Sequence, residues 1–194
     1  MISGVSQFSL SEALVRRART GSPTALVALY QRHGGGMLAV AQRLTGSVAV
    51  ANTVVQDVFV GLPPALRSYD GATPFEVWLK RITIRVAVIR VRQPDKGKPR
   101  ALRLVSAGTH RVPEVPPEIS AADGLMSTVE PDPVAFDQFV GELPDLPRMV
   151  FVLREIEGYS HEEVADLLGI SHRQSKHQFH QARIFLAESM FSRS

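Results

Sequence analysis

The fold of this 194-residue chain is decided by residues 143–186, which read LPDLPRMVFVLREIEGYSHEEVADLLGISHRQSKHQFHQARIFL. Near the middle, Ser160 and Glu163 have the spacing of a capping box, in which each side chain bonds the other residue's backbone amide. A short helix is therefore expected to start after Ser160. Its apolar stripe consists of Val164, Ala165, Leu167 and Leu168. Gly169 can adopt the left-handed conformation that commonly ends a helix, so a turn is expected there.

A second, longer helix is expected after the turn, with Ser171 as its cap and Gln174 at the box position. Its inward residues are Phe179, Ala182 and Leu186. Its outward residues are Arg173, Gln174, Lys176, His177, His180 and Arg183. A short helix, a glycine turn and a longer helix that begins with Arg, Gln and Lys are typical of a helix-turn-helix. Because Arg and Lys bond guanine edges and Gln bonds adenine, this outward face and Ser171 are predicted to bind duplex DNA.

The residues around these two helices point to one family. They are Leu143, Pro144, Arg148, Val150, Phe151, Leu153, Arg154, Glu155, Glu157, Gly158, Tyr159 and Ser160, followed by Gly169, Ile170, Ser171, Lys176, Ala182 and Arg183. Together they resemble domain 4 of the extracytoplasmic-function (ECF) sigma factors of bacterial RNA polymerase. The resemblance implies that this segment recognises the −35 element of a promoter and contacts the flap of the polymerase core. A helical hairpin that never touches DNA is the alternative that the capping boxes alone leave open.

Composition limits the class of protein. A hydrophobic content of 44% supports a packed core. The sequence contains no run of 18 apolar residues, so no membrane span is predicted. No basic segment leads into an apolar one at the N-terminus, so no signal peptide is predicted. The absence of cysteine excludes disulfides and suits a reducing compartment. We therefore expect a cytoplasmic protein that does not contact a membrane.

Charge is distributed unevenly along the chain. Residues 1–92 carry 11 Lys and Arg against 4 Asp and Glu, a net charge of +7. Residues 93–135 carry 5 Lys and Arg against 6 Asp and Glu, a net charge of −1. Residues 136–194 carry 6 Lys and Arg against 9 Asp and Glu, a net charge of −3. A basic first half indicates a polyanionic partner, with a solvated basic face as the alternative.

No enzymatic motif, metal site or cofactor site is predicted. His161 and the two acids after it do not form an H-E-x-x-H motif, because Val164 and Ala165 follow them. His172, His177 and His180 have no carboxylate or thiolate at a ligand spacing, which disfavours a metal site. The glycine run 34–36 lies between helix-like segments rather than after a strand, which argues against a phosphate-binding loop.

Four helices are expected in the first half. Ser9 and Glu12 have capping-box spacing for the first, which ends near Arg19, and Ser22 and Pro23 begin the second. The second should turn Leu26, Leu29 and Tyr30 inward and kink or break at residues 34–36, since each Gly costs about 1 kcal/mol relative to Ala. The third is expected over residues 48–62, ended by the prolines at 63 and 64. Thr73, Pro74 and Glu76 begin the fourth, which ends at Arg92 and buries Phe75, Trp78, Leu79, Ile82, Val86 and Ile89.

The third and fourth helices resemble sigma domain 2. The resemblance rests on Val54, Val55, Gln56, Asp57, Val58 and Phe59, and on Phe75, Trp78, Leu79, Arg81, Ile82 and Ala87. It implies that the third helix docks on the clamp helices of the largest polymerase subunit through Asn52, Thr53, Gln56, Asp57 and Phe59. It also implies that the loop 67–73 captures a flipped base of the melted −10 element. The implied −10 residues are Arg67, Ser68, Tyr69, Asp70, Lys80, Arg81 and Arg85.

Residues 93–131 are predicted to be a linker, because they contain six prolines and no sustained apolar period. The expected architecture is all-α. Two small helical domains, residues 1–92 and 132–194, are joined by this proline-containing linker. The expected partners are the RNA polymerase core and promoter DNA.

Some positions depart from the family's pattern. The acidic cluster that usually opens the docking helix is replaced by Ala51, Asn52 and Thr53. Phosphorylation of Thr53 would return negative charge there, so a Ser/Thr kinase is one expected regulator and an anti-sigma factor is the other. Ser175 stands where an apolar residue is usual in the recognition helix. Two alternatives to a sigma factor are a helix-turn-helix regulator that never binds polymerase and an adaptor that has lost its DNA-binding surface.

Overall fold

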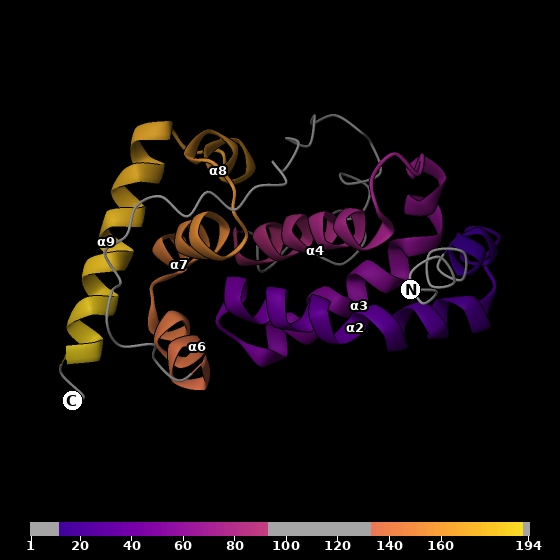
Figure 1. Ribbon diagram of the computed structural model, residues 1–194, viewed down its shortest axis with the longest axis horizontal. Helices are drawn as coiled ribbons and strands as arrows, with labels where there is room; N and C mark the ends of the chain where they lie inside the picture. Colours follow the sequence, from indigo (N-terminus) through magenta and orange to yellow (C-terminus); the bar gives the residue numbers. More distant parts are fainter. Residues whose placement is uncertain (1–11, 93–132, 192–194) are drawn as a thin grey trace, which may run out of the picture. The chain divides into compact units, whose positions relative to one another are not determined.

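The computed structural model describes residues 12–92 and 133–191. In this part of the chain all regular structure is helical and no strand is present, which confirms the all-α prediction (Figure 1). The contacts divide the chain into two compact units. The first contains Met1–Gln42 and Val48–His110, and the second contains Arg43–Ser47 and Arg111–Ser194. The predicted linker, residues 93–131, and the capping residue Ser9 lie outside the described residues.

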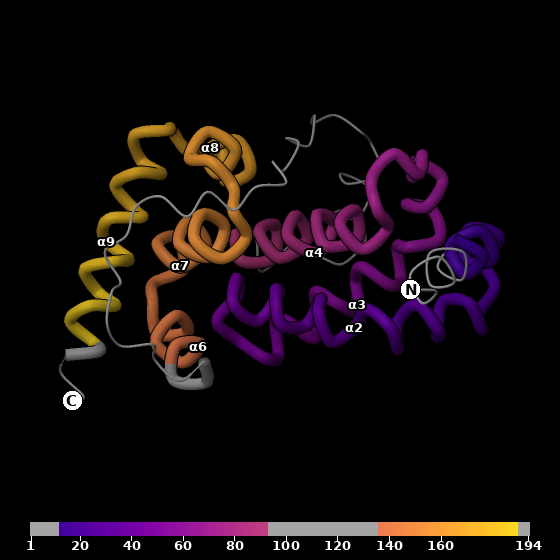
Figure 2. Tube along the Cα trace, in the orientation of Figure 1, coloured from indigo at the N-terminus to yellow at the C-terminus, as the bar shows by residue number. Residues whose placement is uncertain are grey.

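The first unit contains a helix over residues 12–19, then α2 (Pro23–Thr45), α3 (Val48–Ala65), a 3₁₀ turn η1 (Leu66–Ser68) and α4 (Phe75–Arg92). The last three residues of α2 belong to the second unit. α3 packs along α4, as the Cα trace of Figure 2 shows. The fully buried side chains include Leu29, Leu62, Leu66, Leu79, Ile84, Val54 and Val58. They form the apolar core of this unit. Tyr30, expected inside, is instead 52% exposed.

The glycine run does not break α2. The helix continues through residues 34–36 to Thr45, so the expected break is wrong. Leu29, Met37 and Ala41 are buried on either side of the run, and burial of an amphipathic face is the main source of helix stability in proteins. That packing outweighs the low helix propensity of glycine.

The two prolines do not end α3 at Leu62 either. The helix includes Pro63 and Pro64 and ends at Ala65. A proline in a helix loses its N–H bond and its ring crowds the preceding turn. Burial of Leu62 and Ala65 on either side of the prolines offsets this cost and holds the last turn in the core. Among the described helices, only the stretch Val48–Ser68 is long and apolar enough to cross a membrane. Its helix α3 packs against α4, and 44% of the apolar window is buried inside the protein.

The second unit contains α6 (Pro133–Glu142), α7 (Asp145–Phe151), a π-helical turn η2 (Val152–Ile156), α8 (His161–Leu168) and α9 (His172–Phe191). α9 packs against both α7 and α8 (Figure 1). The predicted capping box at Ser160 and Glu163 is present, and Gly169 ends α8 with φ 59°. Ser171 and Gln174 likewise exchange side-chain to backbone bonds of 3.1 and 2.9 Å. The helix-turn-helix therefore forms where the local sequence predicted it.

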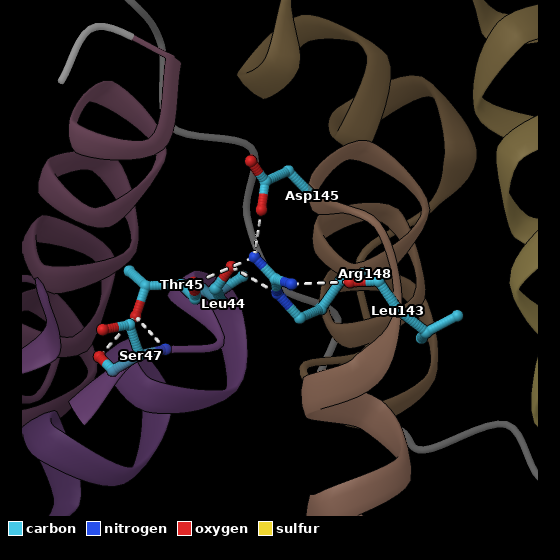
Figure 3. A network of polar contacts seen from close by, with 6 residues as sticks. All are labelled: Leu44, Thr45, Ser47, Leu143, Asp145 and Arg148. Atoms are coloured by element: carbon cyan, nitrogen blue, oxygen red, sulfur yellow. Dashed lines mark hydrogen bonds and ion pairs between the residues drawn. The ribbon is translucent and has the colours of Figure 1, made fainter.

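A buried arginine organises the second unit (Figure 3). Arg148 is 4% exposed and donates to the carbonyl oxygens of Leu143 at 2.6 Å, Thr45 at 2.9 Å and Leu44 at 3.3 Å. Its remaining partner is the Asp145 carboxylate. Because the guanidinium occupies this site, a Cβ on Gly46 would lie 2.7 Å from its carbon. Gly46 also has a φ of +65°, so both the space and the backbone favour glycine.

Candidate nucleic-acid and polymerase interfaces

The outward face of α9 is exposed. Ser171, Arg173, Gln174, Lys176, His177, His180 and Arg183 all lie on the surface. Ser171 and the Gln174 amide oxygen are engaged in the cap, which leaves the Gln174 amide NH₂ available to an acceptor. Arg183 lies over the Phe179 ring, with its guanidinium carbon 5.9 Å from the ring centre. The cations of the first two turns, Arg173 and Lys176, are therefore the side chains of this face most open to a ligand.

A polar contact that the sequence did not reveal links α8 to α9. The His161 Nδ1 lies 2.9 Å from the hydroxyl of Ser175, which is fully buried. The imidazole also meets the Phe179 ring edge-on, with 5.5 Å between ring centres. Burial lowers the pKa of His161, and the positive charges of Arg154, His172 and Lys176 lower it further. The unusual Ser175 thus has a partner, and the signal for it was a hydroxyl at a helical position that is usually apolar.

The loop 67–73 of the first unit is held by hydrogen bonds. The Tyr69 hydroxyl donates to the Thr73 carbonyl oxygen at 2.8 Å, and the Asp70 carboxylate accepts the Ala72 amide at 2.9 Å. Ser68 donates to the Ala65 carbonyl oxygen at 2.8 Å. From outside the loop, Arg19 donates to the Tyr69 carbonyl oxygen at 2.7 Å. The loop therefore has a defined shape before any ligand is bound.

Aromatic side chains form the floor of this loop. The Tyr69 ring centre lies 5.0 Å from that of Trp78 and 5.7 Å from that of Phe75. His33 meets Phe75 edge-on from α2, 5.5 Å away. Burial raises the pKa of Tyr69, and the nearby carboxylates of Asp70 and Glu12 raise it further. Tyr69, predicted as a −10 contact, is half-buried, and its ring packs against those of Trp78 and Phe75.

The basic side chains of α4 do not share one surface. Arg81 and Arg85 lie one turn apart on the same side, whereas Lys80 lies about 100° round the helix from Arg81. Lys80 is exposed, and Arg81 and Arg85 are half-buried. The Arg81 Nε is buried without a hydrogen-bond partner among the described residues. Arg81 and Arg85 therefore form a pair, and Lys80 belongs to a neighbouring surface.

The predicted docking helix presents an uncharged face. Asn52 and Gln56 are exposed, and Thr53 and Phe59 are half-buried. Asp57 is only 5% exposed and forms an ion pair with Arg90 of α4. The expectation that Asp57 lies on the docking surface is therefore wrong, because its carboxylate is needed inside the domain. Val48 and Val60, which are 54% and 82% exposed, complete the outer stripe.

Within the described helices, no group of three or more His, Cys, Asp or Glu residues could hold a metal ion. The three histidines of α9, His172, His177 and His180, thus do not gather with acids in the structure. The chemistry available at these surfaces is hydrogen bonding, stacking and cation contact.

Comparison with known proteins identifies the family. The Sigma-70 region 2 model matches residues 29–96, and the Sigma-70, region 4 model matches residues 134–186. The ECF RNA polymerase sigma-E factor of Escherichia coli K12 is 30% identical over 164 residues, which cover 81% of this chain and 82% of that protein. The chain belongs to the ECF sigma factors.

Further relatives are more distant. The RNA polymerase sigma-H factor of Pseudomonas aeruginosa is 27% identical to this sigma factor over 164 residues, or 81% of each chain. A solved structure of CnrH in complex with the cytosolic domain of CnrY is 26% identical, covers 94% of this chain and 97% of that chain, and superposes with a TM-score of 0.49.

The two family matches cover the surfaces described above. Sigma factors are non-enzymatic initiation factors that bind the polymerase core and promoter DNA. The α9 face lies within the region 4 match. The loop, α3 and α4 lie within the region 2 match. The helix over residues 12–19, which holds the loop through Arg19, lies outside both matches.

Proposed function

We propose that this sigma factor docks on the polymerase core through α3, reads a duplex −35 element with α9, and holds the melted −10 strand with the loop 67–73 and α4. The observation that supports this assignment best is the start of α9. Arg173 and Lys176 lie exposed on a helix whose first turn is fixed by a reciprocal cap, so their positions relative to the groove are set in advance. Such early-turn side chains reach base edges and phosphates.

The assignment is tested by transcription with purified core polymerase and a promoter library. If Arg173 reads a base, Arg173→Ala should weaken promoter binding by about 1–3 kcal/mol. It should also relax the base preference at one position of the −35 element. Lys176→Ala should weaken all promoters alike if Lys176 holds a phosphate. Arg154→Ala, a change of an exposed arginine outside α9, is the matched control. If neither α9 change alters promoter use more than the control does, α9 is not the −35 surface.

The alternative helix-turn-helix regulator is separated by dependence on polymerase. A regulator of that kind protects DNA from cleavage by itself, whereas a sigma factor requires the core enzyme. The basic first unit, with its preformed loop, favours the sigma function, because a simple regulator needs no single-strand site. Footprinting with and without core decides between them. The proposed place of action is the cytoplasm, where polymerase works.

A finer proposal concerns regulation at Thr53. With Asp57 buried, the outer face of α3 carries no acid, although the family's docking partner is basic. Thr53 is half-exposed on this face, and its hydroxyl donates to the Ala49 carbonyl oxygen at 3.0 Å. A phosphate would add a charge of about −1.5 to −2 and strong acceptors for arginine. Because Thr53 is beyond the first turn of α3, the gain would come from the partner's cations rather than the helix dipole.

This proposal is tested by measuring core affinity for the unmodified protein, Thr53→Ala and the protein phosphorylated at Thr53. Phosphorylation should tighten binding, and Thr53→Ala should match the unmodified protein. Equal affinity of the phosphorylated and unmodified forms would exclude the switch. In that case an anti-sigma factor becomes the favoured regulator, and a search for a protein that competes with core for α3 would follow.

A further inference from the structure

We propose that the helix over residues 12–19 is a wall of the single-strand site, in which Arg19 positions the loop 67–73 and Arg16 contacts the phosphate backbone of the melted strand. The inference deepens the proposed function, on which it rests. It assigns promoter contacts to a helix that lies outside the residues matched by the Sigma-70 region 2 model.

The first step is the bond from Arg19. Its Nη2 donates to the Tyr69 carbonyl oxygen at 2.7 Å, across 50 residues of sequence. The other hydrogen bonds seen in the loop are made within residues 65–73. Among the described residues, the Arg19 bond is therefore a hydrogen bond that connects the backbone of this loop to the rest of the first unit. This bond restrains the Tyr69 peptide plane, and with it the proposed base-binding surface of the loop.

The second step is the face that this helix turns toward the loop. Residues 12, 16 and 19 follow the i, i+4, i+7 spacing of one helix face. All three of these residues are exposed, whereas Val15 and Ala18 of the same helix are buried. The two ends of the face are near Tyr69, since Arg19 bonds its carbonyl and the Glu12 carboxylate is close enough to raise its pKa. Arg16 lies between these two ends, so it belongs to the rim of the same loop.

The third step is the availability of Arg16. Its side chain is exposed and makes no hydrogen bond or ion pair with the described residues. Arg17, by contrast, donates to the Thr24 hydroxyl at 3.2 Å and faces away from the loop. An unengaged guanidinium beside a base-capture loop suits the sugar-phosphate backbone that enters and leaves it. The negative charge of Glu12 repels DNA phosphates from the N-terminal end of this helix. The sugar-phosphate backbone of the melted DNA should therefore cross the helix at the turn that carries Arg16 and Arg19.

The experiment measures binding of holoenzyme to a single-stranded oligonucleotide that carries the non-template −10 sequence selected from a promoter library, over a range of salt concentrations. The variants are Arg16→Ala, Arg19→Ala and Arg19→Lys. The matched control is Arg32→Ala, which removes an exposed arginine of α2 in the same unit. Core affinity and thermal unfolding of each variant are measured alongside, so that a folding defect is recognised.

Arg16→Ala should weaken oligonucleotide binding several-fold and lower the slope of log affinity against log salt by about 0.7, the value for one phosphate contact on a single strand. Arg19→Ala should weaken binding and lower permanganate reactivity of −10 thymines in open complexes, and Arg19→Lys, which keeps a donor, should restore part of both. Core affinity should be unchanged in all of them. If wild-type holoenzyme binds the oligonucleotide and both alanine variants behave like Arg32→Ala, the inference is overturned while the proposed function stands. If wild-type holoenzyme does not bind it, the proposed single-strand site itself is wrong.

Discussion

Asp57 and Arg90 form a buried ion pair that ties α3 to α4, with side chains only 5% and 13% exposed. The Arg90 Nε donates to one Asp57 carboxylate oxygen at 2.8 Å, and a second guanidinium nitrogen bonds the same oxygen. These two helices carry the proposed docking face and the proposed −10 surface. The ion pair therefore fixes the proposed docking face and the proposed −10 surface in position relative to each other.

Breaking this pair should destabilise the first unit strongly. Asp57→Ala leaves the Arg90 guanidinium buried without its partner, a change that costs about 3–5 kcal/mol. Denaturant unfolding followed by fluorescence of Trp78, the only tryptophan, reports on this unit. The double change Asp57→Leu with Arg90→Leu should recover most of the loss, because apolar replacement of a buried pair is often neutral. Asp166→Asn, at an exposed acid of α8, is the control and should stay within about 0.5 kcal/mol.

The histidine at the start of α8 should make the second unit sensitive to acid. Because the folded-state pKa of His161 is lowered below its ordinary value of 6.5, the fold favours the neutral ring. The contribution of His161 to the free energy of unfolding is therefore complete above pH 6.5, the ordinary pKa of the unfolded chain. It is lost as the pH falls from 6.5 through the lower pKa of the folded protein. Burial and the charges of Arg154, His172 and Lys176 all act in this direction. NMR titration of the His161 ring should give a pKa below 6.5.

Replacement of the ring tests the cause. Asn places its oxygen near the position of Nδ1, so His161→Asn should keep the bond to Ser175 and remove the titration. The acid loss of stability in the second unit should then shrink, measured by circular dichroism melting at several pH values. His177→Asn, at an exposed histidine of α9, should leave it unchanged. An acid loss that is the same in His161→Asn and wild type would show that another group causes it.

The glycines of α2 should be replaceable with a gain in stability. A Cβ at Gly35 or Gly36 meets no atom within 4 Å, and both positions lie inside the helix. Each change to Ala should stabilise the first unit by about 0.5–1 kcal/mol, since Gly is the poorer helix former. Gly34→Ala should gain at least as much, because its Cβ would make an ordinary contact with the Tyr30 ring, 3.4 Å away. Unfolding followed by Trp78 fluorescence gives the three values.

Gly46→Ala is the contrasting change. The residue has a φ of +65°, and its Cβ would lie 2.7 Å from the Arg148 guanidinium, so the substitution should destabilise the second unit by about 1–3 kcal/mol. A stabilising Gly46→Ala would mean that the Arg148 site can relax. A destabilising Gly35→Ala would mean that the helix is not regular at this position in solution.

The sequence predicted the features made by residues that are close together in the chain, and it missed contacts between residues that are far apart in the chain. The boxes at Ser160 and Ser171 and the turn at Gly169 depend on residues within four positions of each other, and all were predicted. At the glycine run and the prolines, local propensity predicted interruptions, and burial of the surrounding side chains kept the helices intact. The contacts of Asp57 with Arg90 and of Arg19 with Tyr69 span 33 and 50 residues, so no local pattern contains them.

The last prediction concerns how core binding responds to salt. The outer stripe of α3, made of Val48, Asn52, Gln56 and Val60, contains no charge, and Val60 is 82% exposed. Burial of such a face depends on apolar area and neutral hydrogen bonds, which salt screens little. Core affinity of the unmodified protein should therefore change little between low and physiological salt. Phosphorylation at Thr53 should add a component that falls as salt rises.

A single side chain tests this face. Val60→Ser removes an apolar group that docking would bury, and a fully buried valine contributes about 1.5–3 kcal/mol, so core affinity should fall roughly tenfold or more. The salt dependence should stay as flat as in the unmodified protein, because no charge has changed. Val27→Ser, at a valine of α2 that is 56% exposed, is the matched control and should bind core normally. If core affinity is steeply salt-dependent in the unmodified protein, or unaffected by Val60→Ser, then the docking contact is made by charged residues away from this stripe.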